Sequence, residues 1–461
     1  MRQTVGMRLS RRAFLAAGLL GTVAVTTKRI LLGGGGGPFA DAAPLSVAEL
    51  TTGDQAGYCW FNDVRALRVN GKLYFGNIDP AGNVECRALD ESTGIVSAVA
   101  ATYPAFQADD HDNPSFLRRD SDGHIMAFFT AHVGAVYKTV GTAADDVASL
   151  TLANTTNITG EVGGITDAAG YTYASAFQLL GEASDPIFLS FRYHNAPVAE
   201  FAFHAMSKSI DGGVNFTDLD GVANAHSLLV LVTYHRAVQN GDDRIDFAYS
   251  NHPDDAGDHG IYHAYYQGGN LYQTDGTLIG APGDGGEIGG AYGVGDLTQV
   301  FDDAGGMAWI WDIAIDDAGE PVVAFVVYEP SYPTGPWSYK RAHRVAGAWV
   351  VDDVADAGGK FPTTSDLAHG GQYAGGIAID RFNTERVYYS SDAGGGNHKI
   401  YEATTPNGGT TWPAVQISDG LDDAVRPIAV TGEPGQTRVL WEHGTYDDYF
   451  GNYAMDIAAW R

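Results

Sequence analysis

Six side chains of the kinds that transfer protons or bind anions are spread between residues 111 and 252 of the sequence. One of them, His111, lies among the aspartates of Ala108-Asp109-Asp110-His111-Asp112-Asn113-Pro114. Histidine titrates near neutrality, tyrosine can donate a proton, and arginine binds a carboxylate with two hydrogen bonds. The candidate residues are His111, His132, Tyr173, Arg192, Tyr234 and His252.

Together these residue types could carry out β-elimination on a polysaccharide that contains uronic acid. Arg192 would neutralise the uronate carboxylate and thereby acidify the adjacent C5 proton. A histidine would take that proton, and a tyrosine would protonate the departing glycosidic oxygen. The product would carry an unsaturated uronate at its new non-reducing end.

Most of these residues also have a purely structural interpretation. The aspartates around His111 are typical of a solvated loop in which carboxylates cap turns. Tyr173 and Tyr234 could be core residues with satisfied hydroxyls, and His252 could be a turn residue before proline. Arg192 follows an apolar strand, where a cation needs an anionic partner.

Metal binding has weaker support in the sequence. His259 and His263 have a spacing that could hold a metal ion, although short histidine pairs are common by chance. Cys59 and Cys86 are too few for a disulfide framework and lack zinc-site spacing. They could form a single bridge or remain two buried free thiols.

A short repeated pattern predicts the elements that position the candidate residues. A polar or glycine turn precedes an apolar strand about seven times, at intervals of roughly 50 to 80 residues, which is typical of a β-propeller with one copy per blade. The predicted strands cover residues 73–76, 125–128, 187–190, 245–248, 322–325, 386–389 and 438–441.

Two further segments favour the same architecture. Residues 209–216 and 405–412 both resemble the Asp-box, a hairpin turn in which an Asp or Asn side chain bonds the backbone and glycines supply positive φ. We therefore predict an all-β, seven-bladed β-propeller. Because equivalent strand ends meet on one face of such a ring, His132, Arg192 and His252 are expected to meet in one canyon.

Composition and charge limit the classes of partner. The chain has 461 residues, of which 60 are glycine, and its net charge is -29. So acidic a chain argues against nucleic acid as a partner, because phosphate binding needs a basic face. A surface of one charge sign would suit a saline habitat. A polyanionic substrate would then require a locally basic canyon, with salt screening the remaining surface.

The N-terminus predicts export. Paired arginines, Arg11 and Arg12, precede an apolar segment over residues 13–25, and Ala40-Asp41-Ala42 offers a small-x-small cleavage site. We expect residues 1–42 to be a removed twin-arginine-type signal and residues 43–461 to form a single propeller, secreted or periplasmic, without a membrane anchor. The alternative is an uncleaved anchor.

Several motifs together resemble those of one carbohydrate-active family. As a set they resemble the ulvan lyases of polysaccharide lyase families 24 and 25, within the large BNR-repeat group of propellers. The resemblance extends over nearly all of the chain after the signal, and its motifs are residues 110–114, 122–125, 244–247, 251–253, 260–266, 274–279 and 311–316.

The resemblance implies roles for the candidate residues. His111 would be the catalytic histidine, Tyr173 its tyrosine partner and Arg192 the group that neutralises the carboxylate. Tyr173 has a competitor, because Tyr171 lies two residues away and would point to the same strand face. The remaining canyon residues, His132, Tyr234 and His252, would bind substrate or form a second acid/base set.

The resemblance also implies substrate and cofactors. It implies a sulfated rhamnose–uronic acid polysaccharide, no cofactor for catalysis, and often a structural metal ion such as zinc or calcium. We expect a monomer that acts on an anionic polysaccharide. Two alternatives stay open: a sialidase-like glycoside hydrolase, which needs an arginine cluster and paired acidic groups, and a non-catalytic glycan-binding propeller.

Overall fold

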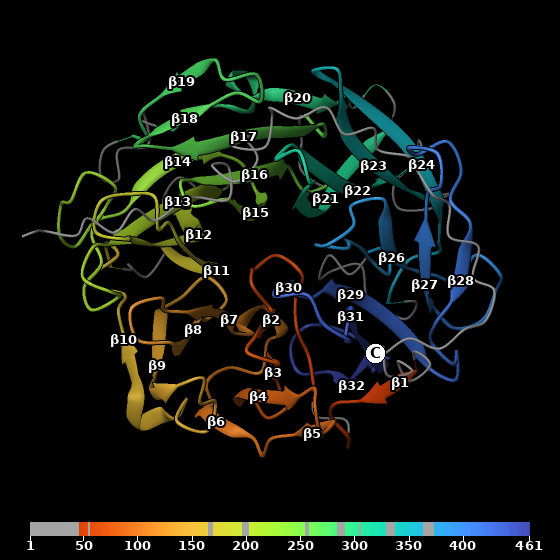
Figure 1. The fold of residues 1–461 in the computed structure, drawn as a ribbon, viewed down its shortest axis with the longest axis horizontal. Coiled ribbons are helices and arrows are strands. Elements are labelled where there is room, and N and C mark those ends of the chain that lie inside the picture. The colour runs from red at the N-terminus through yellow and green to blue at the C-terminus, as the bar shows by residue number, and fades with distance from the viewer. Residues whose placement is uncertain are drawn as a thin grey trace, which may run out of the picture. The chain divides into compact units, whose positions relative to one another are not determined.

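The described part of the chain is folded almost entirely into β-strands. The structure is a computed structural model. It describes residues 46–53, 56–164, 169–195, 202–253, 258–283, 291–302, 304, 306–328, 337–362 and 373–461. In these ranges the strands form seven sheets, which surround a common centre as the blades of a propeller (Figure 1).

The first three blades follow one another along the chain. Blade 1 contains β2 (Ala66–Val69), β3 (Lys72–Ile78), β4 (Val84–Asp90), β5 (Ile95–Val96) and β6 (Ala100–Tyr103). Blade 2 contains β7 (Ser115–Arg118), β8 (His124–Thr130), β9 (Val136–Ala144) and β10 (Thr155–Asn157). Blade 3 contains β11 (Ala169–Gln178), β12 (Ile187–Asn195), β13 (Ala202–Ser209) and β14 (Ser227–Leu231).

Blades 4 to 6 continue the same antiparallel order. Blade 4 contains β15 (Tyr234–Asn240), β16 (Arg244–Ser250), β17 (Ile261–Gln267), β18 (Asn270–Tyr272), β19 (Leu278–Gly280) and β20 (Thr298–Phe301). Blade 5 contains β21 (Met307–Ile315), β22 (Pro321–Tyr328), β23 (Trp337–Val345) and β24 (Ala348–Gly358). Blade 6 contains β25 (Ile377–Ile379), β26 (Arg386–Ser391), β27 (Lys399–Thr404) and β28 (Ala414–Gln416).

Blade 7 joins the two ends of the described chain. It contains β29 (Asp423–Ala429), β31 (Val439–Tyr446), β32 (Tyr453–Trp460) and, as its outermost strand, β1 (Val47–Glu49). The register pairs Val47 with Trp460, so the first strand completes the last sheet. A short strand, β30 (Thr431–Gly432), runs parallel to β2 and links blade 7 to blade 1. Three single-turn 3-10 helices are described: η1 (Asp110–Asp112), η2 (Leu152–Asn154) and η5 (Val294–Asp296).

The repeated sequence pattern marks equivalent strands. The seven predicted segments fall in β3, β8, β12, β16, β22, β26 and β31, and each of these is the second strand of its blade. These strands are packed on both faces; every residue of β22, for example, is buried. A strand buried on both sides requires a near-continuous apolar run, which explains why this strand of each blade was readable from the sequence.

The two Asp-box segments form the predicted structural turns. The Asp211 carboxylate accepts hydrogen bonds from the backbone of Val214 and Asn215, while Gly212 and Gly213 adopt φ of 75° and 83°. Asn407 accepts a hydrogen bond from the Thr411 backbone in the same way. Both boxes therefore stabilise hairpins, and neither contributes to the site described below.

The predicted export segment, residues 1–42 with its cleavage site, lies outside the described residues. Residues 45–461 form one compact unit. Within the ranges given above, no helix has the length and apolar character needed to cross a membrane.

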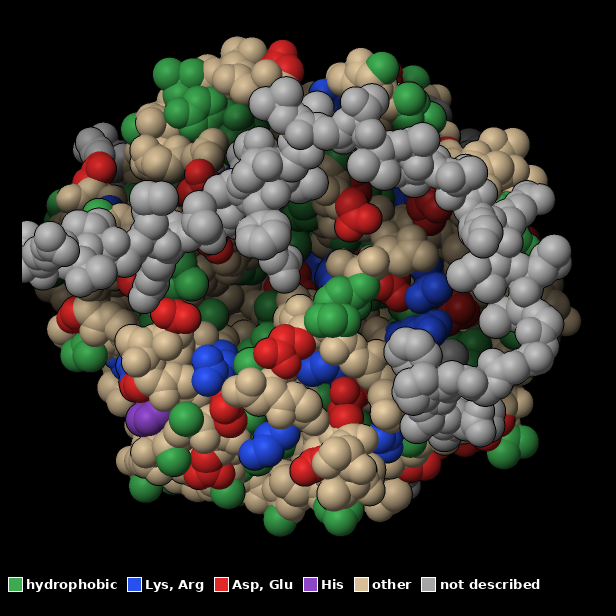
Figure 2. Space-filling model, in the orientation of Figure 1, with side chains coloured by type: hydrophobic (Ala, Val, Ile, Leu, Met, Phe, Trp, Pro, Cys, Tyr) green, Lys and Arg blue, Asp and Glu red, His purple; other side chains and the backbone are tan. Residues whose placement is uncertain are grey.

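The face of the molecule drawn in Figure 2 carries both acidic and basic side chains. Figure 2 shows acidic and basic side chains interspersed over this face, without a continuous basic area in the visible part.

Candidate active site

His111 and His132 come from different parts of blade 2 and lie face to face. His111 belongs to η1, where the carboxylate of Asp109 caps the turn by accepting a hydrogen bond from the His111 backbone at 3.0 Å. His132 follows the end of β8. The two imidazole rings are stacked, with centroids 4.0 Å apart and an interplanar angle of 7°.

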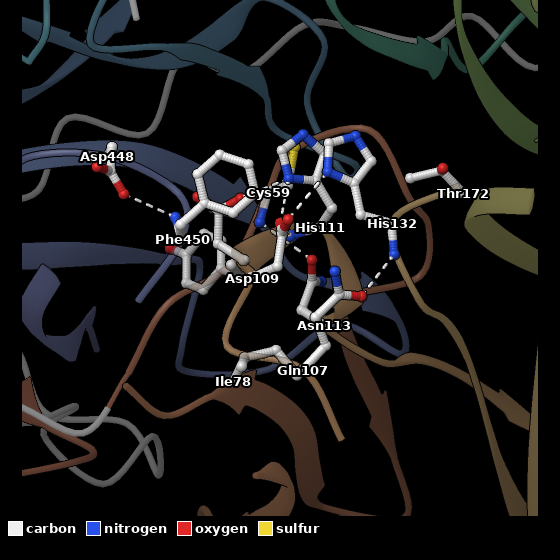
Figure 3. Close-up of polar contacts among 12 residues, drawn as sticks. Cys59, Ile78, Gln107, Asp109, His111, Asn113, His132, Thr172, Asp448 and Phe450 are labelled. Carbon is white, nitrogen blue, oxygen red and sulfur yellow. Dashed lines mark hydrogen bonds and ion pairs between the residues drawn. The ribbon is translucent and has the colours of Figure 1, made fainter. Parts of the chain in front are cut away.

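Asp109 bridges these two rings. Its Oδ1 lies 2.5 Å from His111 Nδ1, and its Oδ2 lies 2.9 Å from His132 Nδ1. Figure 3 shows the carboxylate reaching both imidazoles from below. Asp110 Oδ1 lies 3.0 Å from His111 Nδ1. Asp109 is fully buried, so its charge acts on both rings with little screening by water.

The two histidines therefore titrate differently. Burial disfavours the charged form of His111, but Asp109, Cys59 and Asp110 together raise the His111 pKa well above its ordinary value. For His132, burial and the neighbouring charge of His111 lower the pKa to about 4, although Asp109 acts in the opposite direction. At neutral pH the pair thus consists of an imidazolium and a neutral imidazole.

Tyr173 enters the same cluster through a β-bulge. The pairing of β11 with β12 shifts register between Thr172 and Ser175, and Tyr173 itself has φ of 63°. Bulges commonly redirect side chains beside functional sites. Tyr173 packs 5.5 Å from His111, whereas Tyr171 belongs to a different hydrophobic cluster. The expectation that both tyrosines share one face was wrong, because the bulge breaks the two-residue alternation.

Arg192 lies beneath two tyrosine rings. It is 6% exposed, and its guanidinium carbon lies 4.5 Å from the ring centre of Tyr173 and 5.3 Å from that of Tyr234. Among the described residues no carboxylate forms a salt bridge with Arg192, and its Nε has no hydrogen-bond partner there. The anionic partner that the sequence required is therefore not supplied by the described protein, and an anionic ligand could fill that role.

The remaining two candidates extend the cluster into blade 4. Tyr234 is the first residue of β15, and its ring lies 6.2 Å from that of Tyr173. His252 follows β16 and lies 5.8 Å from Tyr234 and 4.7 Å from Trp309. The six residues singled out in the sequence thus form one continuous series of contacts, although their roles stay predictions.

A cavity next to this cluster contains residues that the sequence analysis did not identify. It is a small pocket that is partly open to solvent. Asp110, His111, Tyr173 and Tyr234 line it. The rest of its lining is a set of mainly aromatic residues from blades 5 to 7 and from the segment before β2. The latter set is Cys59, Trp60, Phe61, Trp309, Tyr373, Arg426, Tyr446 and Tyr449. The run Cys-Trp-Phe before a strand was the available signal for the first three.

Arg426 connects blade 7 to the histidine turn. Its guanidinium lies 2.7 Å from Asp110 Oδ2 and 3.4 Å from Glu442 Oε2. Burial raises the pKa of Glu442 to about 8, despite the opposing charge of Arg426. The charged groups of this region are therefore Arg192, Arg426 and the His111 imidazolium against the carboxylates of Asp109 and Asp110.

The weak metal candidates His259 and His263 lie elsewhere in blade 4. The two ring nitrogens of His263 contact Asp246 Oδ1 at 3.0 Å and Thr274 Oγ1 at 2.9 Å. Within the part of the chain that the structure describes, neither histidine belongs to a group of three or more potential ligands. A metal ion at this pair stays a prediction. Cys59 and Cys86 are both free and buried, which resolves the choice that the sequence left open.

The sequence matches the profile of the BNR repeat-containing family over residues 74–357, more than half of the chain. The chain belongs to this family. No curated protein sequence matches this BNR repeat-containing protein significantly.

Three solved structures show the same fold as this BNR repeat-containing protein. A polysaccharide lyase of the PL25 ulvan lyase family has a TM-score of 0.62 and 14% identity, covering 87% of this chain and 93% of its own. A second structure of a PL25 ulvan lyase, bound to -[GlcA(1-4)Rha3S]-, has a TM-score of 0.61 at the same identity and coverage. The polysaccharide lyase Uly1 gives 0.53 and 12% identity, covering 90% of this chain and 98% of its own.

Proposed function

We propose that this protein is a polysaccharide lyase that cleaves a uronate-containing polysaccharide by β-elimination. The observation that carries the proposal is the buried, cationic Arg192, which has no carboxylate partner among the described residues and lies between two tyrosines. A buried cation of this kind is stabilised by an anionic ligand. The fold shared with ulvan lyases supports a sulfated rhamnose–uronate polymer as the substrate.

The charge states of the cluster suggest which residue would carry out each step of the reaction. Arg192 would bind the uronate carboxylate with its planar fork, and the His111 imidazolium would add a second positive charge nearby. Both groups would stabilise the negative charge that develops on the carboxylate as the C5–H bond breaks. This role differs from proton abstraction by His111, because an imidazolium has no free lone pair to accept the proton.

The neutral histidine would then be the base. His132 would take the C5 proton through the ring nitrogen that Asp109 does not bind. Tyr173, whose pKa burial raises well above its ordinary value, keeps its proton at neutral pH and would donate it to the departing glycosidic oxygen. The C4–O bond breaks as the C4–C5 double bond forms, and Tyr234 and His252 would position the adjoining sugars.

The direct test is incubation with ulvan while the near-ultraviolet absorbance of the new double bond is followed. Arg192→Ala should lower kcat/KM by about 100-fold or more, since each charge-assisted hydrogen bond contributes about 1.5 to 3 kcal/mol. Arg192→Lys should fall in between, because lysine keeps the charge but loses the bidentate fork.

His124→Ala is the matched control. His124 begins the strand β8 that leads to His132, but it lies at the opposite end of that strand beside Asp122. It should therefore leave activity unchanged. Reducing sugar released without a double bond would instead favour a hydrolase, and binding without product would favour a glycan-binding module. Full activity in Arg192→Ala would end the proposed mechanism.

We further propose that the protein acts outside the cytoplasm. The proposal rests on the paired arginines at positions 11 and 12 ahead of an apolar segment and a small-x-small site. A polymeric substrate is consistent with this location, because a large polysaccharide is degraded before uptake.

A further inference from the structure

A thiol lies next to the histidine turn and has no part in the proposed elimination. Cys59, Asp110 and His111 each offer one ligand atom, and these atoms all lie within 4.8 Å of one another. The three residues line the cavity and are buried. In Figure 3 the sulfur of Cys59 lies directly behind the His111 ring.

The surroundings hold these three groups in place. Asp110 Oδ2 is held by Arg426 Nη1 and by the Tyr446 hydroxyl, at 2.7 Å and 2.5 Å. Its other oxygen, Oδ1, is buried and lies 3.0 Å from His111 Nδ1, so the carboxylate faces the histidine. His111 is in turn fixed by Asp109. Partners that orient ligands in this way are a regular feature of protein metal sites.

The combination of donor atoms is selective for a class of cation. Sulfur and imidazole nitrogen favour zinc and other thiophilic metals, whereas calcium and magnesium prefer sites made entirely of oxygen. A carboxylate oxygen completes a three-residue set, which is the number of protein ligands that leaves one position of a tetrahedral zinc ion open. In this protein that position would face the cavity.

We propose that Cys59, Asp110 and His111 form a binding site for Zn²⁺ or a similar thiophilic divalent cation, and that the bound ion blocks the cavity. A cysteine binds a metal ion as the thiolate, so the ion would take the place of the Cys59 thiol proton.

The second cysteine provides a matched control. Cys86 lies in β4, is also buried, and accepts a hydrogen bond from Thr102 at 3.2 Å. In the described ranges it belongs to no group of three or more potential ligands. Cys59→Ser and Cys86→Ser thus remove the same atom from two buried positions, only one of which lies beside a histidine and a carboxylate.

The test uses Cd²⁺ as the probe, because a cadmium–thiolate bond has an ultraviolet charge-transfer absorption. Titration of the wild-type protein should produce this absorption with a stoichiometry of one, and Zn²⁺ should compete it away. Cys86→Ser should behave like the wild type. Cys59→Ser should lose the absorption and bind Cd²⁺ at least about 100-fold more weakly, since even partners outside the ligand set affect metal affinity by about 10- to 100-fold.

Two results would overturn the proposal. One is the absence of the absorption in the wild-type protein. The other is a Cys59→Ser variant that binds Cd²⁺ like the wild type: a persistent absorption would place the ion at the Cys86 thiol, and an unchanged affinity without the absorption would place it at the neighbouring group of Asp109, His111 and His132. The readout needs no enzymatic activity, so it separates failure of the metal site from failure of the proposed lyase function. If both hold, Zn²⁺ inhibits ulvan cleavage by the wild type, and a chelator restores it.

Discussion

Replacing Asp109 by asparagine tests whether His111 is the charged histidine of the pair and His132 the neutral one. The carboxylate makes one close contact to each ring, at 2.5 Å to His111 and 2.9 Å to His132. Asparagine has nearly the same shape but offers one oxygen instead of two and directs an NH₂ group at the other ring. It therefore removes both the negative charge and at least one of the two hydrogen bonds.

The size of the effect follows from these contacts. A hydrogen bond to a charged group contributes about 1.5 to 3 kcal/mol, and about 1.4 kcal/mol corresponds to a factor of ten, so kcat/KM should fall by about 10- to 100-fold. Asp109 is also the main reason that the His111 pKa is raised, while the burial that lowers it remains in the variant. The variant should therefore lose the His111 proton at neutral pH.

This loss gives the experiment its characteristic pH dependence. If the imidazolium form of His111 is needed, activity of Asp109→Asn should recover partly as the pH falls through the neutral range, whereas the wild type should show no such gain. Kinetics on ulvan across pH, together with ¹⁵N chemical shifts of the histidine rings, would measure both quantities.

Asp112 supplies the control for this substitution. It lies in the same 3-10 turn and is equally buried, but burial and the charge of Asp109 raise its pKa well above the ordinary value. Among the described groups its two oxygens have no hydrogen-bond partner. Asp112→Asn should therefore have much the smaller effect. An Asp109→Asn variant with wild-type activity and an unshifted histidine titration would refute the assignment of charge.

Two further predictions concern stability and export. Because the Glu442 pKa is raised from 4.5 to about 8, the folded state binds a proton that the unfolded state has released, so the free energy of unfolding falls as pH rises through this interval. Glu442→Gln should remove this fall in the free energy of unfolding. In scanning calorimetry its melting temperature should therefore decline less than that of the wild type towards alkaline pH. Parallel declines would contradict Glu442 as the cause. Replacing both Arg11 and Arg12 by lysine should leave the protein in the cytoplasm of its host, as cell fractionation would show, and undiminished export would exclude a twin-arginine signal.

The fold was predictable because its repeat is local. Each blade carries one strand packed on both faces, and such a strand is written in the sequence as an apolar run after a turn, as in Val322 to Phe325. Three of the six candidate residues also follow from this repeat, since His132, Arg192 and His252 lie at or near the same end of equivalent strands. Their convergence needed the ring but no knowledge of side-chain detail.

The parts of the site that could not be predicted depend on long-range or irregular features. Tyr173 faces the site because of a bulge, and alternation alone would have placed it with Tyr171. Arg426 reaches Asp110 across 316 residues of sequence, which only closure of the ring brings about. Asp109 bridges the two histidines, whereas its two acidic neighbours in the motif, Asp110 and Asp112, do not, and this difference depends on the conformation of one short turn.

The pairing of β1 with β32 makes formation of the ring a late event in folding. Val47 and Trp460 are partners although more than 400 residues separate them. A contact of such sequence separation forms slowly from an unfolded chain, but blades 1 to 6 can each fold from contiguous sequence beforehand. During synthesis the histidine turn would exist well before Arg426 and Glu442 emerge to bind it. The finished site, unlike the blade that carries its histidines, is therefore assembled only when the circle of blades closes.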